Sequence, residues 1–102
     1  MTKKDFDRIA QRYGMEYLYR QLAEEATELA QAALKVIRAV RKETPMSVDE
    51  ARLRLLEEMA DLRVMMDLLY SFRMTKSARE WLEDMRAQKD RRMVERLLGG
   101  TK

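Results

Sequence analysis

Apolar residues recur at helical spacing in four segments of the chain. Because an α-helix turns once in about 3.6 residues, apolar positions three and four apart lie on one face of a helix. No segment alternates apolar and polar residues as a half-buried strand would. The pattern therefore predicts an all-α fold, with helices at about residues 5–13, 15–43, 48–72 and 78–98.

Turn and cap residues separate the predicted helices. Gly14 is suited to a left-handed C-cap after the first helix, and Pro45 would end the second helix just before it. In a capping box, a Ser and a Glu three residues apart satisfy free backbone N–H groups at a helix start. Two such boxes predict the starts of the last two helices: Ser47 with Glu50, and Ser77 with Glu80.

The second predicted helix is long for a chain of 102 residues. A helix over residues 15–43 would extend about 43 Å, whereas a domain of this length has a radius of gyration of about 13 Å. A hairpin of two such helices would leave much of its apolar surface exposed. We therefore expect an antiparallel helical bundle completed by oligomerisation, as a homodimer or a homotetramer.

Composition excludes several classes of function. The chain has no cysteine and no histidine, which excludes thiol nucleophiles, disulfides and most zinc sites. The charged N-terminus lacks the apolar core of a signal peptide, and no apolar run is long enough to cross a membrane, so we expect a cytoplasmic protein. The net charge of +3 is too small to argue for a nucleic-acid partner.

One acidic motif occurs twice. The stretch "LAEEATEL" at residues 22–29 returns 33 residues later as "LLEEMADL" at residues 55–62, and both read Leu-x-Glu-Glu-x-x-acid-Leu. On helical wheels, the second glutamate of each motif lies at about −60° from the first leucine, and the final acid at about −120°. Glu24 and Glu57, the first glutamate of each motif, would point away into solvent.

The wheels also predict which residues are buried. On each long helix, apolar residues within about 40° of the first leucine of the motif should form the packed face. These are Leu18, Leu22, Ala26, Leu29 and Ala33 on one helix, and Leu55, Met59, Leu62, Met66 and Leu69 on the next.

The remaining acids favour a metal site. If the long helices pack antiparallel, Glu25 and Glu28 converge with Glu58 and Asp61 at the edge of the core. Crowded, partly desolvated carboxylates either take up protons or bind a cation. Oxygen-only ligands suit Mg²⁺, with Mn²⁺ as a possible substitute. A single acid pair three residues apart usually forms a solvated face, but two copies in the same helical phase favour a metal.

In this order and phase, the acids resemble the EExxE…ExxD signature of all-α nucleoside triphosphate pyrophosphohydrolases. More narrowly, the chain is similar to the short MazG-like proteins of bacteria and phages. The likeness covers about residues 13–98 and includes "YGMEYLYRQLAEEATEL", "LLEEMADLRVMMDLL" and the ending Trp81…"KDRRMVERL".

The resemblance implies an enzyme that uses Mg²⁺ to cleave a (d)NTP into a (d)NMP and pyrophosphate, in nucleotide-pool housekeeping. Metal-activated water would be the nucleophile, in agreement with the absence of histidine and cysteine. Carried over by motif position, the metal ligands would be Glu25, Glu28, Glu58 and Asp61, and Glu24 would belong to the same catalytic motif.

Four further residues are candidates for contacts with the substrate. Lys35 lies two turns after Glu28 and could reach a phosphate, or could be a solvated lysine. Lys89 and Arg92 match a basic segment of the family and could also bind phosphates, whereas Gln21 could touch the base or ribose.

Two other classes of function compete with the hydrolase. A non-catalytic helical protein that kept the fold, for nucleotide binding or for interaction, would keep the same acids without turnover. A small basic nucleic-acid binder would use "RAVRK" and "RRMVERLLGGTK", but acids are interleaved with the bases and no recognition-helix motif occurs.

Overall fold

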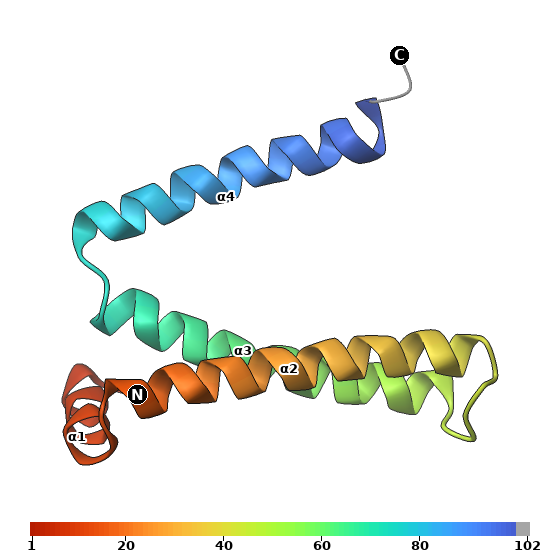
Figure 1. Cartoon of the computed structure of the whole chain (residues 1–102), viewed down its shortest axis with the longest axis horizontal. Helices are drawn as coiled ribbons and strands as arrows, with labels where there is room; N and C mark the ends of the chain where they lie inside the picture. Colours follow the sequence, from red (N-terminus) through yellow and green to blue (C-terminus); the bar gives the residue numbers. More distant parts are fainter. Residues whose placement is uncertain (100–102) are drawn as a thin grey trace. The chain divides into compact units, whose positions relative to one another are not determined.

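The computed structural model describes residues 1–99, and this part of the chain is all-α, as predicted. It contains four helices (Figure 1): α1 at Lys3–Tyr13, α2 at Met15–Val40, α3 at Val48–Phe72 and α4 at Lys76–Leu97. The chain divides into two units, of which the first is Met1–Phe72 and the second contains α4. Each unit is described below by itself.

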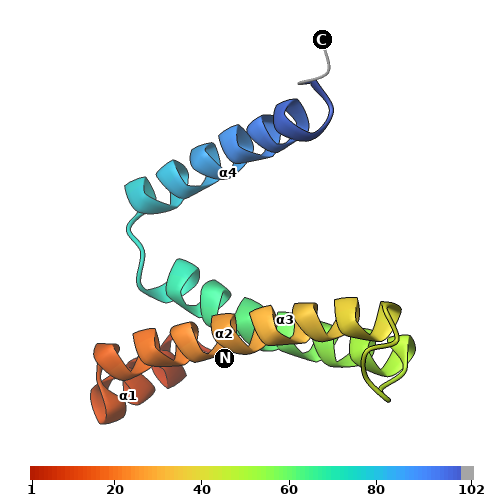
Figure 2. The same cartoon turned by 45° about the vertical axis from the view of Figure 1, so that its right-hand side comes forward.

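The first unit is an antiparallel hairpin of α2 and α3. Helix α1 packs on both of them near the ends that lie away from the α2–α3 loop. The two long helices run side by side in both views, joined by a short loop (Figures 1 and 2). Phe6 of α1 is buried, and its ring lies 5.5 Å from the ring of Phe72 at the end of α3. An aromatic pair at this separation is a favourable contact, so it ties α1 to the hairpin.

The seam between α2 and α3 follows the spacing of an antiparallel coiled coil. Along both helices, residues that are buried or half-buried recur at alternating intervals of three and four positions. This is the spacing of core positions in a heptad. Each seam position of α2 has a counterpart 33 residues later on α3. The seam residues are Met15, Leu18, Leu22, Glu25, Leu29, Ala32, Val36 and Ala39 of α2, and Val48, Ala51, Leu55, Glu58, Leu62, Met65, Leu69 and Phe72 of α3.

The packed face predicted from the wheels was therefore partly wrong. Ala26 and Ala33 are exposed, and Met59 and Met66 are 50% and 54% exposed. The centre of the seam is rotated by about 40° from the predicted centre, toward the acids. The apolar arc of each helix is wider than one neighbouring helix can cover. The apolar residues on the side of the arc away from the acids therefore stay at the surface.

The first helix begins and ends as its sequence requires. Thr2 and Asp5 form a capping box, in which each side chain accepts a hydrogen bond from the other residue's backbone N–H, so α1 starts before the predicted position. Gly14 has φ 84° and ψ 159°, and its N–H donates to the Ala10 carbonyl oxygen at 2.8 Å. This extended conformation with positive φ is open essentially to glycine alone, and it differs from the predicted αL cap.

The second helix ends at Val40, three residues before the predicted end. The backbone N–H groups of Lys42 and Glu43 donate to the carbonyl oxygens of Ala39 and Arg38, at 3.1 Å and 2.9 Å. This pair of bonds is a Schellman motif, and its left-handed residue is Lys42, with φ 60°. The helix therefore ends by its own C-cap before the conformational restriction of Pro45 applies.

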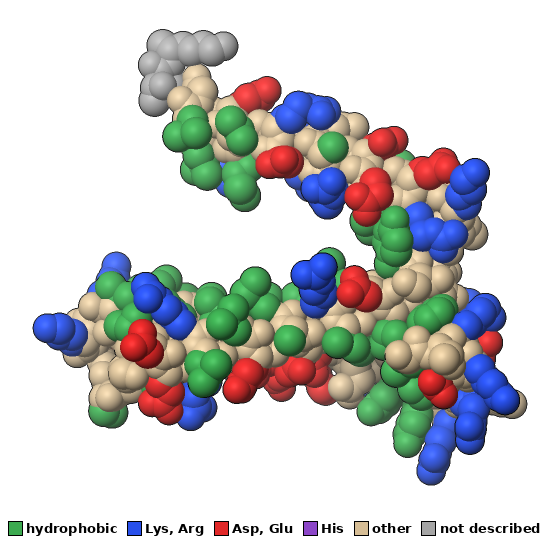
Figure 3. Space-filling model, turned by 180° about the vertical axis from the view of Figure 1, so that it is seen from behind, with side chains coloured by type: hydrophobic (Ala, Val, Ile, Leu, Met, Phe, Trp, Pro, Cys, Tyr) green, Lys and Arg blue, Asp and Glu red, His purple; other side chains and the backbone are tan. Residues whose placement is uncertain are grey.

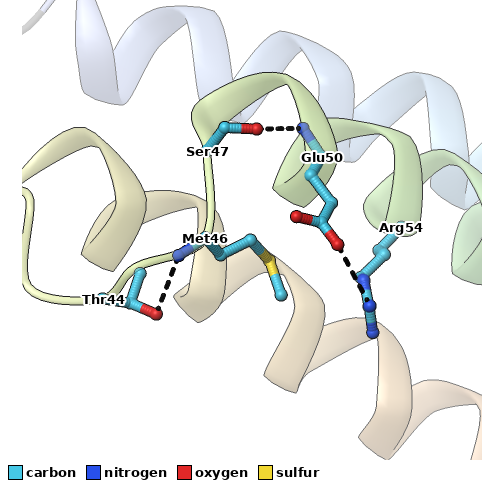
Figure 4. A network of polar contacts seen from close by, with 5 residues as sticks. All are labelled: Thr44, Met46, Ser47, Glu50 and Arg54. Carbon is cyan, nitrogen blue, oxygen red and sulfur yellow. Dashed lines mark hydrogen bonds and ion pairs between the residues drawn. The ribbon is translucent and has the colours of Figure 1, made fainter.

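The last two helices start with a single side-chain cap. Ser47 accepts a hydrogen bond from the Glu50 N–H at 3.1 Å, but the Glu50 carboxylate pairs with Arg54 (Figure 4). The predicted box at Ser47 is thus half formed. The other predicted box, at Ser77, was wrong: Thr75 is the N-cap of α4, accepting from the Ala78 N–H, so the helix starts at Lys76.

The second unit is a single helix with no buried residue within its own bounds. Trp81 is 66% exposed, and Met93, Val94 and Leu97 are also exposed. None of the helices in residues 1–99 combines the length and the apolar character needed to span a bilayer.

Candidate metal centre

The two acidic motifs meet on the α2–α3 seam. Glu25, Glu58 and Asp61 each contribute a carboxylate oxygen to a group in which all three oxygens lie within 4.8 Å of one another. Glu28 is close enough to raise the pKa of both seam glutamates. Acidic side chains gather along one edge of the helix pair (Figure 3). The predicted convergence is therefore present for Glu25, Glu58 and Asp61, and Glu28 affects the two glutamates of this group through its charge.

The heptad explains why the acids converge. Glu25 and Glu58 occupy seam positions that would otherwise carry apolar residues, and they are half-buried between flanking leucines. Glu28 and Asp61 lie three residues further along each helix, almost one turn away, on the same open side of the seam. Leucines on both sides hold the two helices in register, which fixes the acids opposite one another.

Two carboxylate oxygens in the cluster are shielded from water without a hydrogen bond. Oε2 of Glu25 and Oε2 of Glu58 are the buried side-chain atoms without a partner in the described residues. A buried polar atom without a partner is costly, and a buried charge is costlier. The sites of these two atoms therefore fit a ligand that supplies positive charge.

The pKa values of the two seam glutamates reflect the same crowding. Partial burial raises the pKa of Glu25 above its ordinary value, and the charges of Glu28, Asp61 and Glu24 raise it further. Partial burial also raises the pKa of Glu58, with further contributions from Glu28, Asp61 and Glu25. Like charges without a counter-ion disfavour ionisation, which is the effect that a bound cation would reverse.

No basic side chain of residues 1–99 forms an ion pair with any of the four acids. The ion pairs of the helix pair lie elsewhere, for example between Arg20 and Glu16 and between Arg63 and Asp67. The donor set is made of carboxylate oxygens, which suits a hard divalent cation such as Mg²⁺ or Mn²⁺. These residues therefore fit the metal that the sequence predicts.

A groove of about 390 Å³ extends from the cluster along the helix pair. Its walls come from α2 and α3, and it leads from the acids toward the loop that joins these helices. The lining residues are Glu28, Gln31, Ala32 and Lys35 of α2, and Glu50, Leu53, Arg54, Glu57 and Glu58 of α3. Lys35, a predicted phosphate ligand, is thus in the same groove as two of the predicted metal ligands.

Other predicted residues lie at the margin of the cluster or on α4. Glu24 is exposed and accepts a hydrogen bond from the Gln21 amide at 3.4 Å, so its link to the cluster is its charge near Glu25. Lys89 and Arg92 belong to the second unit, where they border a shallow basic depression on α4. Their role as phosphate ligands stays a prediction.

The structure adds residues that the wheels missed. Glu57, expected to point away into solvent, lines the groove beside Glu58. Arg54 and Gln31 also line it, although neither was singled out from the sequence. A signal for Arg54 exists, because it precedes Glu58 by four residues and a helix places such residues on the same face.

Comparisons of the chain with protein-family models, with curated proteins and with solved structures find no match. The resemblance to MazG-like proteins therefore depends on the motif residues themselves and on their arrangement.

Proposed function

We propose that the chain is a Mg²⁺-dependent nucleotide pyrophosphohydrolase of the MazG-like type, which cleaves a (d)NTP into a (d)NMP and pyrophosphate. The proposal is supported by the proximity of the two acidic motifs, in which Glu25 and Glu58 each have a buried carboxylate oxygen without a hydrogen-bond partner. A solvated acidic face would not place these atoms out of contact with water. An acidic seam adjoining a groove that contains Lys35 and Arg54 suits a phosphate ligand with its metal.

The four acids would have different roles in binding the cation and activating water. Glu25 and Glu58, fixed on the seam, would hold the cation from two sides together with Glu28 and Asp61. Bound Mg²⁺ would neutralise phosphate charge and lower the pKa of a water molecule. Glu28 and Asp61 are exposed, so their carboxylates are accessible to orient the attacking water and to accept its proton. Water activated by the metal would be the nucleophile, in agreement with the absence of histidine and cysteine.

A second copy of the chain would complete the fold. The edge of the apolar arc that α2 and α3 leave uncovered includes Ile37, Leu56, Met59 and Met66, each about half exposed or more. Exposed apolar surface of this extent on a helix hairpin is typical of an oligomer interface. We propose that two hairpins pack through this flank as a four-helix bundle, in a homodimer or a homotetramer, with the acidic seam left open.

The test is a panel of (d)NTPs incubated with Mg²⁺, in which pyrophosphate and orthophosphate are measured separately. The proposal predicts a monophosphate and pyrophosphate, with loss of at least about 100-fold in kcat for Glu58→Gln. Glu16→Gln is the matched control, because Glu16 is an exposed glutamate of α2 paired with Arg20. A wild-type protein that turns over no nucleotide, with Mg²⁺ or with Mn²⁺, would refute hydrolysis and favour a non-catalytic helical binder.

A further inference from the structure

The two halves of the α2–α3 hairpin match in their acids but differ in the residues around them. Shifting a residue of α2 by 33 positions gives its counterpart on α3, so Glu25 corresponds to Glu58 and Glu28 to Asp61. Outside the acids and the leucines that flank them, basic residues do not match. Arg54 has Gln21 as its counterpart, and Lys35 has Leu68. One end of the acidic cluster therefore carries Arg54 and Lys35, in a groove that Glu50 and Glu57 also line, whereas their counterparts Gln21 and Leu68 are neutral.

The two cations lie along one line leading from the acids. Arg54 precedes Glu58 by four residues, which places it about 6 Å along the axis of α3. Lys35 follows Glu28 by seven residues, about 10 Å along the axis of α2. Because the helices are antiparallel, both steps lead toward the α2–α3 loop, and both residues line the same groove. A triphosphate chain has a length comparable to these two turns.

Arg54 is available to an incoming anion. Its guanidinium lies 3.3 Å from the Glu50 carboxylate, and the two side chains are 54% and 51% exposed (Figure 4). An exposed ion pair one turn apart on a helix is weak and easily exchanged. A phosphate offers the guanidinium two oxygens in a planar, bidentate arrangement, which is a stronger interaction.

We propose that Arg54 and Lys35 bind the terminal phosphates of the substrate and so select a triphosphate over shorter phosphate chains. The substrate would then lie in one direction, with its phosphates toward the α2–α3 loop and its nucleoside toward the neutral end at Gln21. This assignment rests on the proposed function, because it takes the acidic cluster as the position of the scissile bond. Arg54 is a specificity-determining residue in this arrangement, and Glu50 holds its guanidinium near the groove before substrate binds.

Binding of inorganic phosphates in the presence of Mg²⁺ tests the proposal without turnover. Isothermal titration would compare tripolyphosphate with orthophosphate on the wild-type protein, Arg54→Gln, Arg54→Lys and Arg52→Gln. Arg52 is the matched control, since it is an exposed arginine of the same helix that points away from the groove. We expect Arg54→Gln to weaken tripolyphosphate binding by about tenfold or more, Arg54→Lys to weaken it less, and Arg52→Gln to leave it unchanged.

Two results would overturn the proposal: equal affinities of Arg54→Gln and Arg52→Gln for tripolyphosphate, or a wild-type protein that does not distinguish tripolyphosphate from orthophosphate. Circular dichroism of each variant would confirm that the helices are intact. Failure of the proposed function gives a different pattern. If tripolyphosphate binds in an Arg54-dependent way but no (d)NTP is hydrolysed, the groove assignment stands and the hydrolase is refuted.

Discussion

The carboxylates of Glu25 and Glu58 face each other across the α2–α3 seam, although they lie 33 residues apart in the sequence. Each replaces an apolar residue in an otherwise regular heptad, with leucines at the seam positions on either side. Burying two like charges at the centre of a helix hairpin opposes folding. The proposed cation site would offset this cost, because a bound cation neutralises the like charges.

The pH dependence of stability should reveal this cost in the metal-free protein. The pKa of Glu58 is raised in the fold above its ordinary value of 4.5, so the folded state binds the proton more tightly than the unfolded state. That contribution is fully present below the ordinary pKa and is lost as pH rises through the raised value. Glu58→Gln keeps a neutral side chain and should therefore gain stability relative to wild type as pH rises above about 4.5.

Chemical denaturation at several pH values in the presence of a chelator measures this difference. Glu16→Gln serves as the control. The difference between its free energy of unfolding and that of the wild type should not increase with pH as it does for Glu58→Gln. A Glu58→Gln protein that is less stable than wild type by a constant amount at every pH would contradict the account of the seam.

Much of the fold follows from the sequence because its signals are local. The helical period, Gly14 and Ser47 place α2 and α3 with the correct starts, and the helical phase of the repeated acids brings them together. Side-chain packing decides the rest. The wheels centred the packed face on Leu22 and Leu55, but the apolar arc is wide enough to serve two interfaces. Only the antiparallel pairing shows that the seam passes through Glu25 and Glu58.

The end of α2 could not be read from its sequence for a related reason. Its Schellman motif has a lysine where glycine is usual, so the strongest local signal was Pro45, further on. The groove residues, among them Arg54, are likewise defined by a neighbouring helix. The pattern along one helix shows which of its residues lie on the same face. It does not show which residues of the neighbouring helix lie opposite them.

Lys42→Gly should stabilise the protein. Lys42 has φ 60°, a left-handed conformation that disfavours a side chain, and relief of this strain exceeds the entropic cost of glycine. We expect a gain of about 0.5 kcal/mol in the free energy of unfolding. Urea denaturation measures it, with Arg41→Gly as the control. Arg41 is in a right-handed conformation, so that change should destabilise, and equal effects of the two substitutions would refute the cap.

Phe6→Ala should detach α1 from the hairpin. Phe6 is 3% exposed and lies against the ring of Phe72, so its truncation removes buried contacts and leaves a cavity. The expected loss is about 3 kcal/mol in the free energy of unfolding. Tyr19→Ala is the comparison, because Tyr19 is 53% exposed and its loss should cost less than about 1 kcal/mol. Similar losses for both would show that α1 does not depend on this contact.

Met66→Glu should dissociate the proposed oligomer. Met66 is 54% exposed on the apolar flank, and a charge placed there would be buried in the interface with a second copy. We expect the dissociation constant to rise by roughly 100-fold or more, measured by light scattering after size-exclusion chromatography. Gln31→Glu adds the same charge on the groove side and should leave the mass unchanged. A wild-type protein that is monomeric at all concentrations would disprove the interface.

The most direct test of the central claim is a titration with Mn²⁺ followed by the backbone amide spectrum. If Glu25, Glu28, Glu58 and Asp61 form the proposed cation site, paramagnetic broadening should be saturable and centred on these four residues. It should disappear in Glu25→Gln and in Glu58→Gln, and excess Mg²⁺ should reverse it. Broadening that spreads in proportion over the exposed acids, and survives both substitutions, would show that the seam carboxylates do not act together as a metal site.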